Sequence, residues 1–216
     1  MTKSPKQLLE IANDFARTYM GQFDASHDYQ HIVRVRKLAE VIKMQERALH
    51  PDISYDSDIV ALASLLHDVG DRKYLPSGYD AGSMVENFLL EHDAAPTLAR
   101  TVQAIVTRVS YSAEVKDPGG LQTALSKYPE LAIVQDADRL DAIGAVGIGR
   151  AFTFSAAKGD KNAMAAAVAH IPEKLLKLEG LMKTDTGRSM AKVRTERLRM
   201  FMAWWREETS GFPLEC

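Results

Sequence analysis

Two adjacent polar residues end an apolar run and raise the first question about chemistry. In LLHDVGD, residues 65–71, His67 and Asp68 stand side by side just before Gly70. Burying an ionised carboxylate without a partner costs on the order of tens of kcal/mol, whereas imidazole and carboxylate are both good ligands for divalent metals. Because neighbours on a helix diverge by about 100°, the pair can serve one metal only at a helix end, which Gly70 supplies. Taken alone, the dipeptide is also consistent with a core histidine beside a turn aspartate.

Two further stretches supply partners for this pair. In SHDYQHIVRVRKLA, Asp28 is a suitable helix N-cap, and it would place His31 in the first helical turn. IVQDADRLDAIG is an apolar helical run that carries several acids. Asp138 and Asp141 share a face of it, at a spacing of i, i+3, whereas Asp136 points elsewhere.

One candidate metal site therefore draws its ligands from three predicted helices. Its members are His31, His67, Asp68 and Asp138. Metal sites in helical bundles are built in this way, from side chains on facing helices. Such a centre keeps open positions for water and for a phosphate oxygen.

The elements that must position these residues are helical. Residues 4–20 offer Ser4 as N-cap, Pro5 at the first helical position and Gln7 as capping-box partner. The same period continues through residues 28–49, 56–69, 81–92, 96–110, 129–144, 161–170, 172–183 and 187–209. Because strand-like alternation is missing from the sequence, we expect an all-α, single-domain helical bundle, with residues 112–128 as an irregular surface excursion.

Composition narrows the class of protein. The chain has 216 residues, of which 46% are hydrophobic, so it can bury a sizeable core. A formal charge of -2 gives no global basic field for nucleic acid or a membrane surface. The one cysteine, Cys216, allows no intrachain disulfide, and residues 1–15 lack the unbroken apolar stretch of a signal peptide. We expect a cytoplasmic protein, with the nucleus as the alternative.

The order H…HD…D resembles the HD-domain superfamily of metal-dependent phosphohydrolases, over residues of about 20–155. SHDYQHIVRV, LLHDVGDRKY and DADRLDAIGAVGIGRAF are similar to a small stand-alone branch found as bacterial proteins, some of which hydrolyse nucleoside triphosphates. The resemblance implies a bundle of the HD type across residues 1–216, with C-terminal helices in residues 160–210 packed on the metal-binding core. It also implies that the metal ligands are His31, His67, Asp68 and Asp138.

The resemblance further implies one divalent metal ion. Many two-metal HD phosphodiesterases carry extra histidines after the central pair, but AIVTRVS has none and His92 lies near a predicted helix end. Two imidazoles favour borderline ions over Mg²⁺, which prefers oxygen ligands in a strict octahedron. We therefore expect Mn²⁺, with Fe, Co and Ni as alternatives.

Residues after the HD pair are the candidates for catalysis. Related HD hydrolases often carry an acid where Asp71 stands, so the resemblance implies that Asp71 positions or deprotonates water; the alternative is a solvated turn residue. Lys73 is a second catalytic candidate, because it could offset developing negative charge. Arg72 could clasp phosphate oxygens in two-pronged fashion. The alternative for both cations is an ordinary charged loop.

Three other polar residues are candidates for substrate binding. His27 and Arg34 flank His31 at a predicted helix N-terminus, a natural site for anions. The alternative for His27 is a turn cap. Asp141 could orient a ligand or accept a sugar hydroxyl, and its alternative is a surface ion pair. GAVGIG fits no phosphate-loop pattern, so we assign its glycines to close helix packing.

The reaction expected first is hydrolysis of a nucleoside or deoxynucleoside triphosphate to monophosphate and pyrophosphate. A nucleoside monophosphatase or a phosphodiesterase is the alternative within the superfamily, and a metal-stabilised nucleotide sensor without turnover is the alternative of another class. Nucleic-acid binding through the basic residues of 187–200 is disfavoured, since these can form one solvated helix face. No membrane partner is expected. A core or homodimer stripe is expected from Met200, Met202, Trp204 and Trp205.

Overall fold

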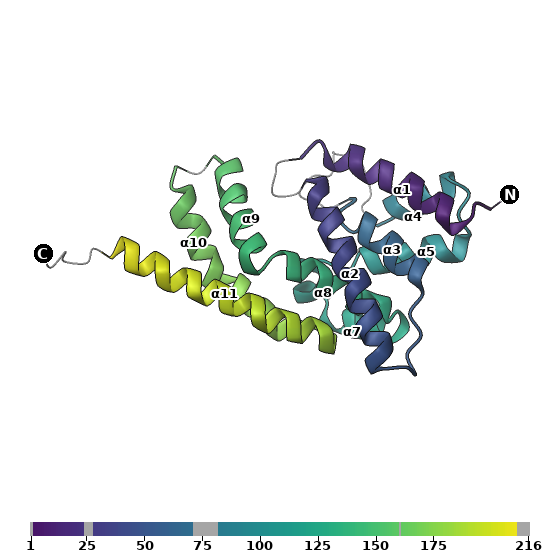
Figure 1. Ribbon diagram of the computed structural model, residues 1–216. Coiled ribbons are helices and arrows are strands. Elements are labelled where there is room, and N and C mark those ends of the chain that lie inside the picture. The colour runs from purple at the N-terminus through teal and green to yellow at the C-terminus, as the bar shows by residue number, and fades with distance from the viewer. Residues whose placement is uncertain (1, 24–27, 71–81, 160, 211–216) are drawn as a thin grey trace, which may run out of the picture.

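A computed structural model describes residues 2–23, 28–70, 82–159 and 161–210 (Figure 1). Every regular element in these ranges is helical, which confirms the predicted all-α class. The elements are α1 (Pro5–Met20), α2 (Tyr29–Leu49), α3 (Ser57–Leu66), α4 (Met84–Glu91), α5 (Pro96–Val106), α6 (Tyr111–Lys116), α7 (Pro118–Lys127), α8 (Glu130–Asp141), α9 (Gly144–Ala157), α10 (Ala163–Glu173), the 3₁₀ helix η1 (Leu175–Leu181) and α11 (Asp185–Thr209).

The first helices begin at the caps predicted from the sequence. Ser4 Oγ accepts from the Gln7 backbone N–H, and the Gln7 side chain accepts from the Ser4 backbone N–H, so the capping box is formed. Asp28 caps α2 by accepting from the His31 backbone N–H. Asp56 caps α3 in the same way. These local bonds fix where each helix starts and therefore which face it buries.

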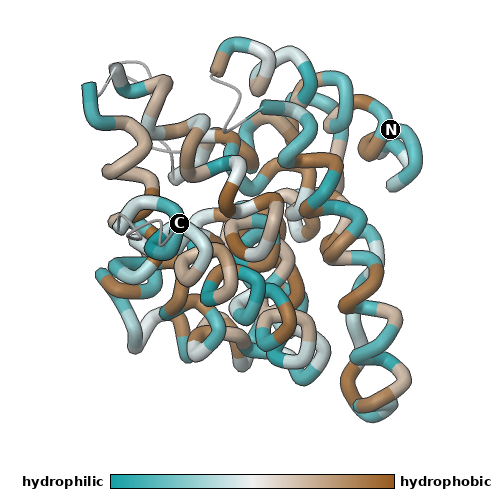
Figure 2. Tube along the Cα trace, turned by 60° about the vertical axis from the view of Figure 1, so that its left-hand side comes forward, coloured by the Kyte–Doolittle hydropathy of each residue, from teal (hydrophilic) through white to brown (hydrophobic). Residues whose placement is uncertain are grey.

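Two hydrophobic cores meet along α2 and α8. The first core lies among α1, α3, α4, α5 and α7, and the second lies among α9, α10, η1 and α11. Both central helices contribute to both cores: Ile32 and Val134 to the first, Val35 and Ala137 to the second. Figure 1 shows this pair between the two groups of helices, and Figure 2 shows apolar and polar residues alternating along the helices.

Residues 112–128 are not the irregular excursion that the sequence predicted. They form α6 and α7, and Asp117 stands between them as the C-cap of the first and the N-cap of the second. Its carboxylate accepts from the Gly120 backbone N–H at 2.9 Å. The prediction was wrong because proline and glycine are tolerated in a capped first turn, and because Leu121 and Ala124 are buried in the first core.

Helix α9 was not among the predicted helices, because three glycines lie in its first half. Close packing explains two of them. Gly144 adopts φ +73° beside the Arg194 side chain, and a Cβ on Gly147 would lie 2.2 Å from the Ala142 carbonyl oxygen. The assignment of the GAVGIG glycines to close packing is confirmed at these two positions.

The C-terminal elements are tied to α8 by Asp136. Its carboxylate accepts from the backbone N–H groups of Lys183 and Thr184 and from the Thr184 hydroxyl, so it holds the start of α11. As predicted, Asp136 points away from Asp138 and Asp141. The predicted helix at residues 172–183 is instead the end of α10 followed by η1.

The aromatic stripe of α11 is divided between core and surface. Trp205 packs against Phe152 with ring centroids 5.9 Å apart, and Met202 packs against the second core. Met200 and Trp204 are exposed. Within the described residues, no helix is both long and apolar enough to span a membrane.

Candidate metal centre

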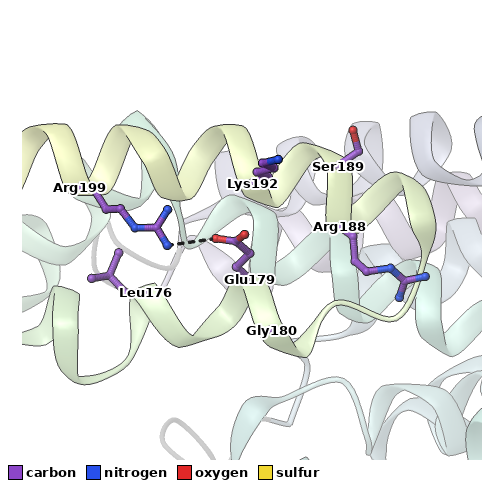
Figure 3. A pocket seen from close by; sticks show the side chains of 7 residues that line it. All are labelled: Leu176, Glu179, Gly180, Arg188, Ser189, Lys192 and Arg199. Carbon is purple, nitrogen blue, oxygen red and sulfur yellow. Dashed lines mark ion pairs between the residues drawn. The ribbon is translucent and has the colours of Figure 1, made fainter.

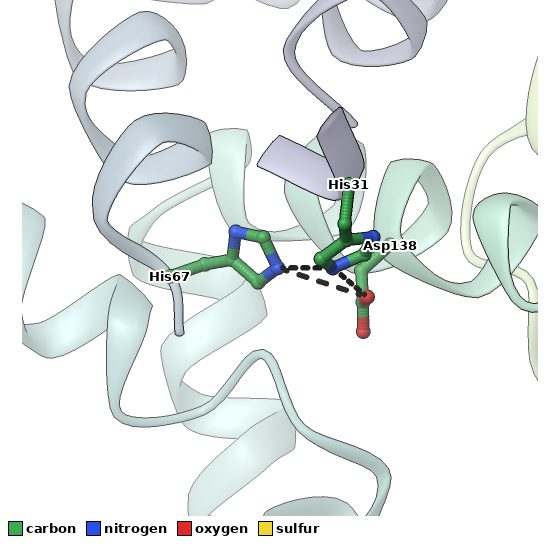
Figure 4. Close-up of side chains that lie close together, drawn as sticks. All are labelled: His31, His67 and Asp138. Carbon is green, nitrogen blue, oxygen red and sulfur yellow. Dashed lines mark hydrogen bonds and ion pairs between the residues drawn. The ribbon is translucent and has the colours of Figure 1, made fainter. Parts of the chain in front are cut away.

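Two histidines from different helices meet at the junction of the two cores. His31 lies in the first turn of α2, where the Asp28 cap places it, and His67 is the residue that ends α3. Their Nε2 atoms are 3.2 Å apart (Figure 4). Both side chains are 1% exposed. The histidine at the end of α3 therefore reaches a common centre, as the sequence predicted.

The hydrogen bonds on the other ring nitrogens define what the Nε2 atoms can do. His67 Nδ1 lies 3.0 Å from the Ser64 carbonyl oxygen, which can only accept, so this nitrogen carries the proton. His31 Nδ1 lies 2.7 Å from an Asp141 carboxylate oxygen, which assigns its proton in the same way. In the neutral rings, two Nε2 lone pairs thus face one another. That arrangement is repulsive unless a cation lies between them.

Asp68 and Asp138 complete the predicted set. The Asp138 Oδ1 atom is 3.5 Å from His31 Nε2 and 3.7 Å from His67 Nε2. Asp68 approaches the same two nitrogens at 3.3 and 3.4 Å. The structure therefore brings together all four residues predicted as ligands. Since Asp68 and Asp138 are 17% and 26% exposed, the carboxylates form the open side of a cluster closed by the histidines.

The electrostatics of the cluster favour positive charge. Burial alone would lower the pKa of His67, but the carboxylates of Asp68 and Asp138 outweigh it and raise this pKa to about 9. Burial likewise opposes the charged form of Asp138, and the interaction with His67 still holds its pKa below the usual range. A divalent ion would supply the charge that a proton supplies here, so the residues present fit a metal.

Asp141 supports the cluster by binding the ring nitrogen of His31 that does not face it. Its carboxylate is 1% exposed and accepts from His31 Nδ1, from Arg34 through Nε and Nη2, and from Arg150 at 3.1 Å. Although burial opposes ionisation, these partners hold the pKa of Asp141 well below its ordinary value. Of the two roles predicted for Asp141, the geometry favours orienting a ligand, because both oxygens are already engaged. Arg34 is directed to Asp141, and its contact with substrate stays a prediction.

Four of the predicted site residues lie outside the described residues. These are His27, Asp71, Arg72 and Lys73. Their roles in binding phosphate or activating water therefore stay predictions.

A cavity of about 280 Å³ opens from the cluster toward α9 and α10. His31, Asp68 and Asp138 line one part of it. Sequence reasoning missed the rest, which includes Tyr111, Arg150, Phe154, His170 and Lys174. Of these, His170 is half-buried. The available signal was the i, i+4 spacing of Arg150 and Phe154, which places both on one helix face.

A second cluster of ligand-type side chains joins α2 to α11, but its carboxylates have other partners. Glu46 accepts from the Thr186 backbone N–H at 2.8 Å and so caps α11. Asp185 pairs with Arg188 and with His50 Nε2. These contacts explain the cluster as a structural connection between two helix ends.

A separate groove of about 590 Å³ lies between η1 and α11 (Figure 3). Its charged residues include Arg188, Lys192 and Arg199, all from the basic segment of α11. Arg199 pairs with Glu179 and Glu196. Since acids already offset part of this charge, the groove agrees with the predicted solvated face of α11, and the disfavoured role in nucleic-acid binding stays a prediction.

Comparison with known proteins identifies the family. The model of the HD domain matches residues 28–143, a span that contains all four clustered residues. The chain belongs to the HD-domain family. The predicted family and enzyme class, an HD-family hydrolase, are thereby confirmed. This HD protein is also 37% identical over 221 residues to the uncharacterised protein YpgQ of Bacillus subtilis, covering 99% of this chain and 98% of YpgQ.

Solved structures show the same fold. Bacillus subtilis YpgQ in complex with ADP is 32% identical, with a TM-score of 0.72 over 96% of this HD protein and 97% of YpgQ. An HD-superfamily hydrolase from Bacillus thuringiensis is 28% identical, with a TM-score of 0.70 over 97% of this chain and 100% of that one. The likeness therefore extends beyond the segment that carries the metal cluster to the helices that follow it.

Proposed function

We propose that this HD protein is a metal-dependent phosphohydrolase that acts on nucleotides, with nucleoside or deoxynucleoside triphosphates cleaved to monophosphate and pyrophosphate. One observation carries the proposal: the Nε2 atoms of His31 and His67 face each other at 3.2 Å beside two carboxylates that line a cavity. The complex of Bacillus subtilis YpgQ with ADP supports a nucleotide as the ligand.

His31, His67, Asp68 and Asp138 would hold one divalent ion. A bound ion there would lower the pKa of a water molecule and polarise a phosphoryl oxygen. Mn²⁺ suits a set of two imidazoles and two carboxylates better than Mg²⁺ does, and Fe, Co and Ni suit it as well. Asp141 keeps the His31 ring in the orientation that presents Nε2 to the centre.

Asp71 and Lys73 are our proposed catalytic residues. Asp71 would accept a proton from the attacking water, and Lys73 would offset charge that develops on the phosphate. Changing Asp71 to Asn should therefore lower turnover by roughly 10²- to 10⁴-fold while leaving the metal content unchanged. Lys73→Ala should mainly weaken nucleotide binding. Parental turnover of Asp71→Asn at saturating substrate would remove Asp71 from the mechanism.

A metal and substrate screen tests the function. Purified protein is reconstituted with Mn²⁺, Co²⁺ or Ni²⁺, analysed for metal, and incubated with nucleoside tri-, di- and monophosphates and a phosphodiester. We expect about one ion per chain and fastest turnover of triphosphates. The matched variants are His67→Ala, which should lose metal and activity, and His92→Ala, whose histidine caps α4 away from the cluster and should keep both. Nucleotide binding without turnover would instead identify a sensor.

A further inference from the structure

One face of α9 forms part of the wall of the cavity. Gly147, Arg150, Ala151 and Phe154 all line it, and their spacing of i, i+3, i+4 and i+7 places them on a single helical stripe. Gly147 and Ala151 are small, so they leave room at the helix surface. Arg150 and Phe154 supply the larger side chains of this stripe.

Helix α10 contributes a second cationic group to the same cavity. His170 and Lys174 are one helical turn apart and both line it. The Lys174 ammonium lies 5.3 Å from the centre of the Tyr111 ring, another lining residue. On the α9 side, Arg150 reaches Asp141 at 3.1 Å, and Asp141 in turn contacts His31. Arg150, His170 and Lys174 form what we call the cationic wall of the cavity. Through the bond from Arg150 to Asp141, this wall is linked to the residue that holds His31.

The lining of the cavity thus combines two kinds of group. The carboxylates and imidazoles of the cluster suit a metal, while Arg150, Lys174 and the ring N–H of His170 suit anionic oxygens. A single phosphate bound at the cluster would make no use of the cationic side chains along α9 and α10. A chain of two or three phosphates would place one phosphorus at the metal and the others along α9 and α10.

We propose that Arg150, His170 and Lys174 form a subsite for the phosphates of a nucleotide that are remote from the reacting phosphorus. This subsite makes the enzyme selective for polyphosphate chains over monophosphates and simple diesters. The inference rests on the proposed function, and it assigns specificity to residues outside the matched HD segment.

The test compares Lys174→Gln with Lys177→Gln. Lys177 is exposed on η1 three residues later and does not line the cavity. For Lys174→Gln, kcat/KM for a nucleoside triphosphate should fall ~10- to 100-fold, the range expected when one charge-assisted contact is lost. Hydrolysis of bis(p-nitrophenyl) phosphate, which has no phosphate chain, should change far less. Lys177→Gln should match the parent on both substrates.

Binding of inorganic tripolyphosphate, measured by calorimetry on the Mn²⁺-loaded protein, separates this inference from the proposed function. The parent should bind it roughly tenfold or more tightly than Lys174→Gln, even if turnover fails. Equal binding by the two proteins would overturn the subsite, as would equal losses on triphosphate and diester. Circular dichroism of each variant verifies that its helices are intact.

Discussion

At the scale of single residues, the chemistry of the site depends on which ring nitrogen of each histidine faces the cluster. The sequence predicted the four clustered side chains because their types and helix positions pointed to one centre. It could not assign the hydrogen bonds from His67 to Ser64 and from His31 to Asp141, which turn both Nε2 atoms toward the cluster. These bonds depend on how α2, α3 and α8 pack together.

Asp141→Asn should weaken Mn²⁺ binding by roughly 10- to 100-fold, because the carboxylate that orients His31 would lose its charge. Isothermal titration calorimetry measures the change. Asp14→Asn is the matched control, since Asp14 is exposed on α1 and does not line the cavity. If both variants bound Mn²⁺ as the parent does, Asp141 would not support the metal centre.

At the scale of elements, the sequence predicted helices well where local signals decided them. Ser4, Asp28 and Asp56 set the starts of α1, α2 and α3 by capping bonds within each segment. Helix α9 was missed because its glycines oppose helix formation locally, and two of them, Gly144 and Gly147, are explained only by packing against Arg194 and Ala142. The cationic wall was missed because α9 and α10 meet the cluster only in the folded chain.

Two glycines of α9 test that packing. A Cβ at Gly147 would lie 2.2 Å from the Ala142 carbonyl oxygen, whereas a Cβ at Gly149 would meet nothing within 4 Å. Gly147→Ala should therefore lower the free energy of unfolding by ~1–3 kcal/mol. Gly149→Ala should raise it by up to about 1 kcal/mol, since alanine is the better helix former. Urea denaturation measures both; a similar stabilisation of both variants would contradict the close contact.

Glu114 links α6 to α8 and to the segment before α11. Burial opposes its ionisation, but Lys183 and Arg139 more than offset this and lower its pKa. A carboxyl whose pKa is lower in the folded state than in the unfolded state stabilises the fold fully at a pH above the unfolded-state pKa. This contribution is lost as the pH falls through the folded-state pKa. The contribution is therefore complete at neutral pH and declines below about pH 5.

Glu114→Gln should reduce the free energy of unfolding by ~1–3 kcal/mol at pH 7, because Arg139 is almost fully buried and would lose a charged partner. The difference from the parent should shrink as the pH is lowered. Urea denaturation across a pH series measures this, with Glu196→Gln, an exposed residue of α11, as the control. A difference that stays constant with pH would argue against a role for the Glu114 charge.

At the scale of the whole molecule, the site lies where two cores meet. Helices α2 and α8 carry His31 and Asp138 to the junction and bury their other faces in both cores. The helices on one side supply the HD pair, and those on the other supply the cationic wall. Because the two sides come from distant parts of the chain, the sequence motifs could predict the metal centre but not the cavity beside it.

The central claim is that this chain cleaves a nucleoside triphosphate with a metal held by His31, His67, Asp68 and Asp138. Phosphorus-31 NMR of the triphosphate incubated with Mn²⁺-reconstituted protein, taken after the paramagnetic metal is chelated, tests it most directly. We predict nucleoside monophosphate and pyrophosphate in equal amounts, and unchanged triphosphate with Asp68→Ala protein that keeps its helicity. Inorganic phosphate as the first product, or unchanged triphosphate with fully loaded parent protein, would contradict the account.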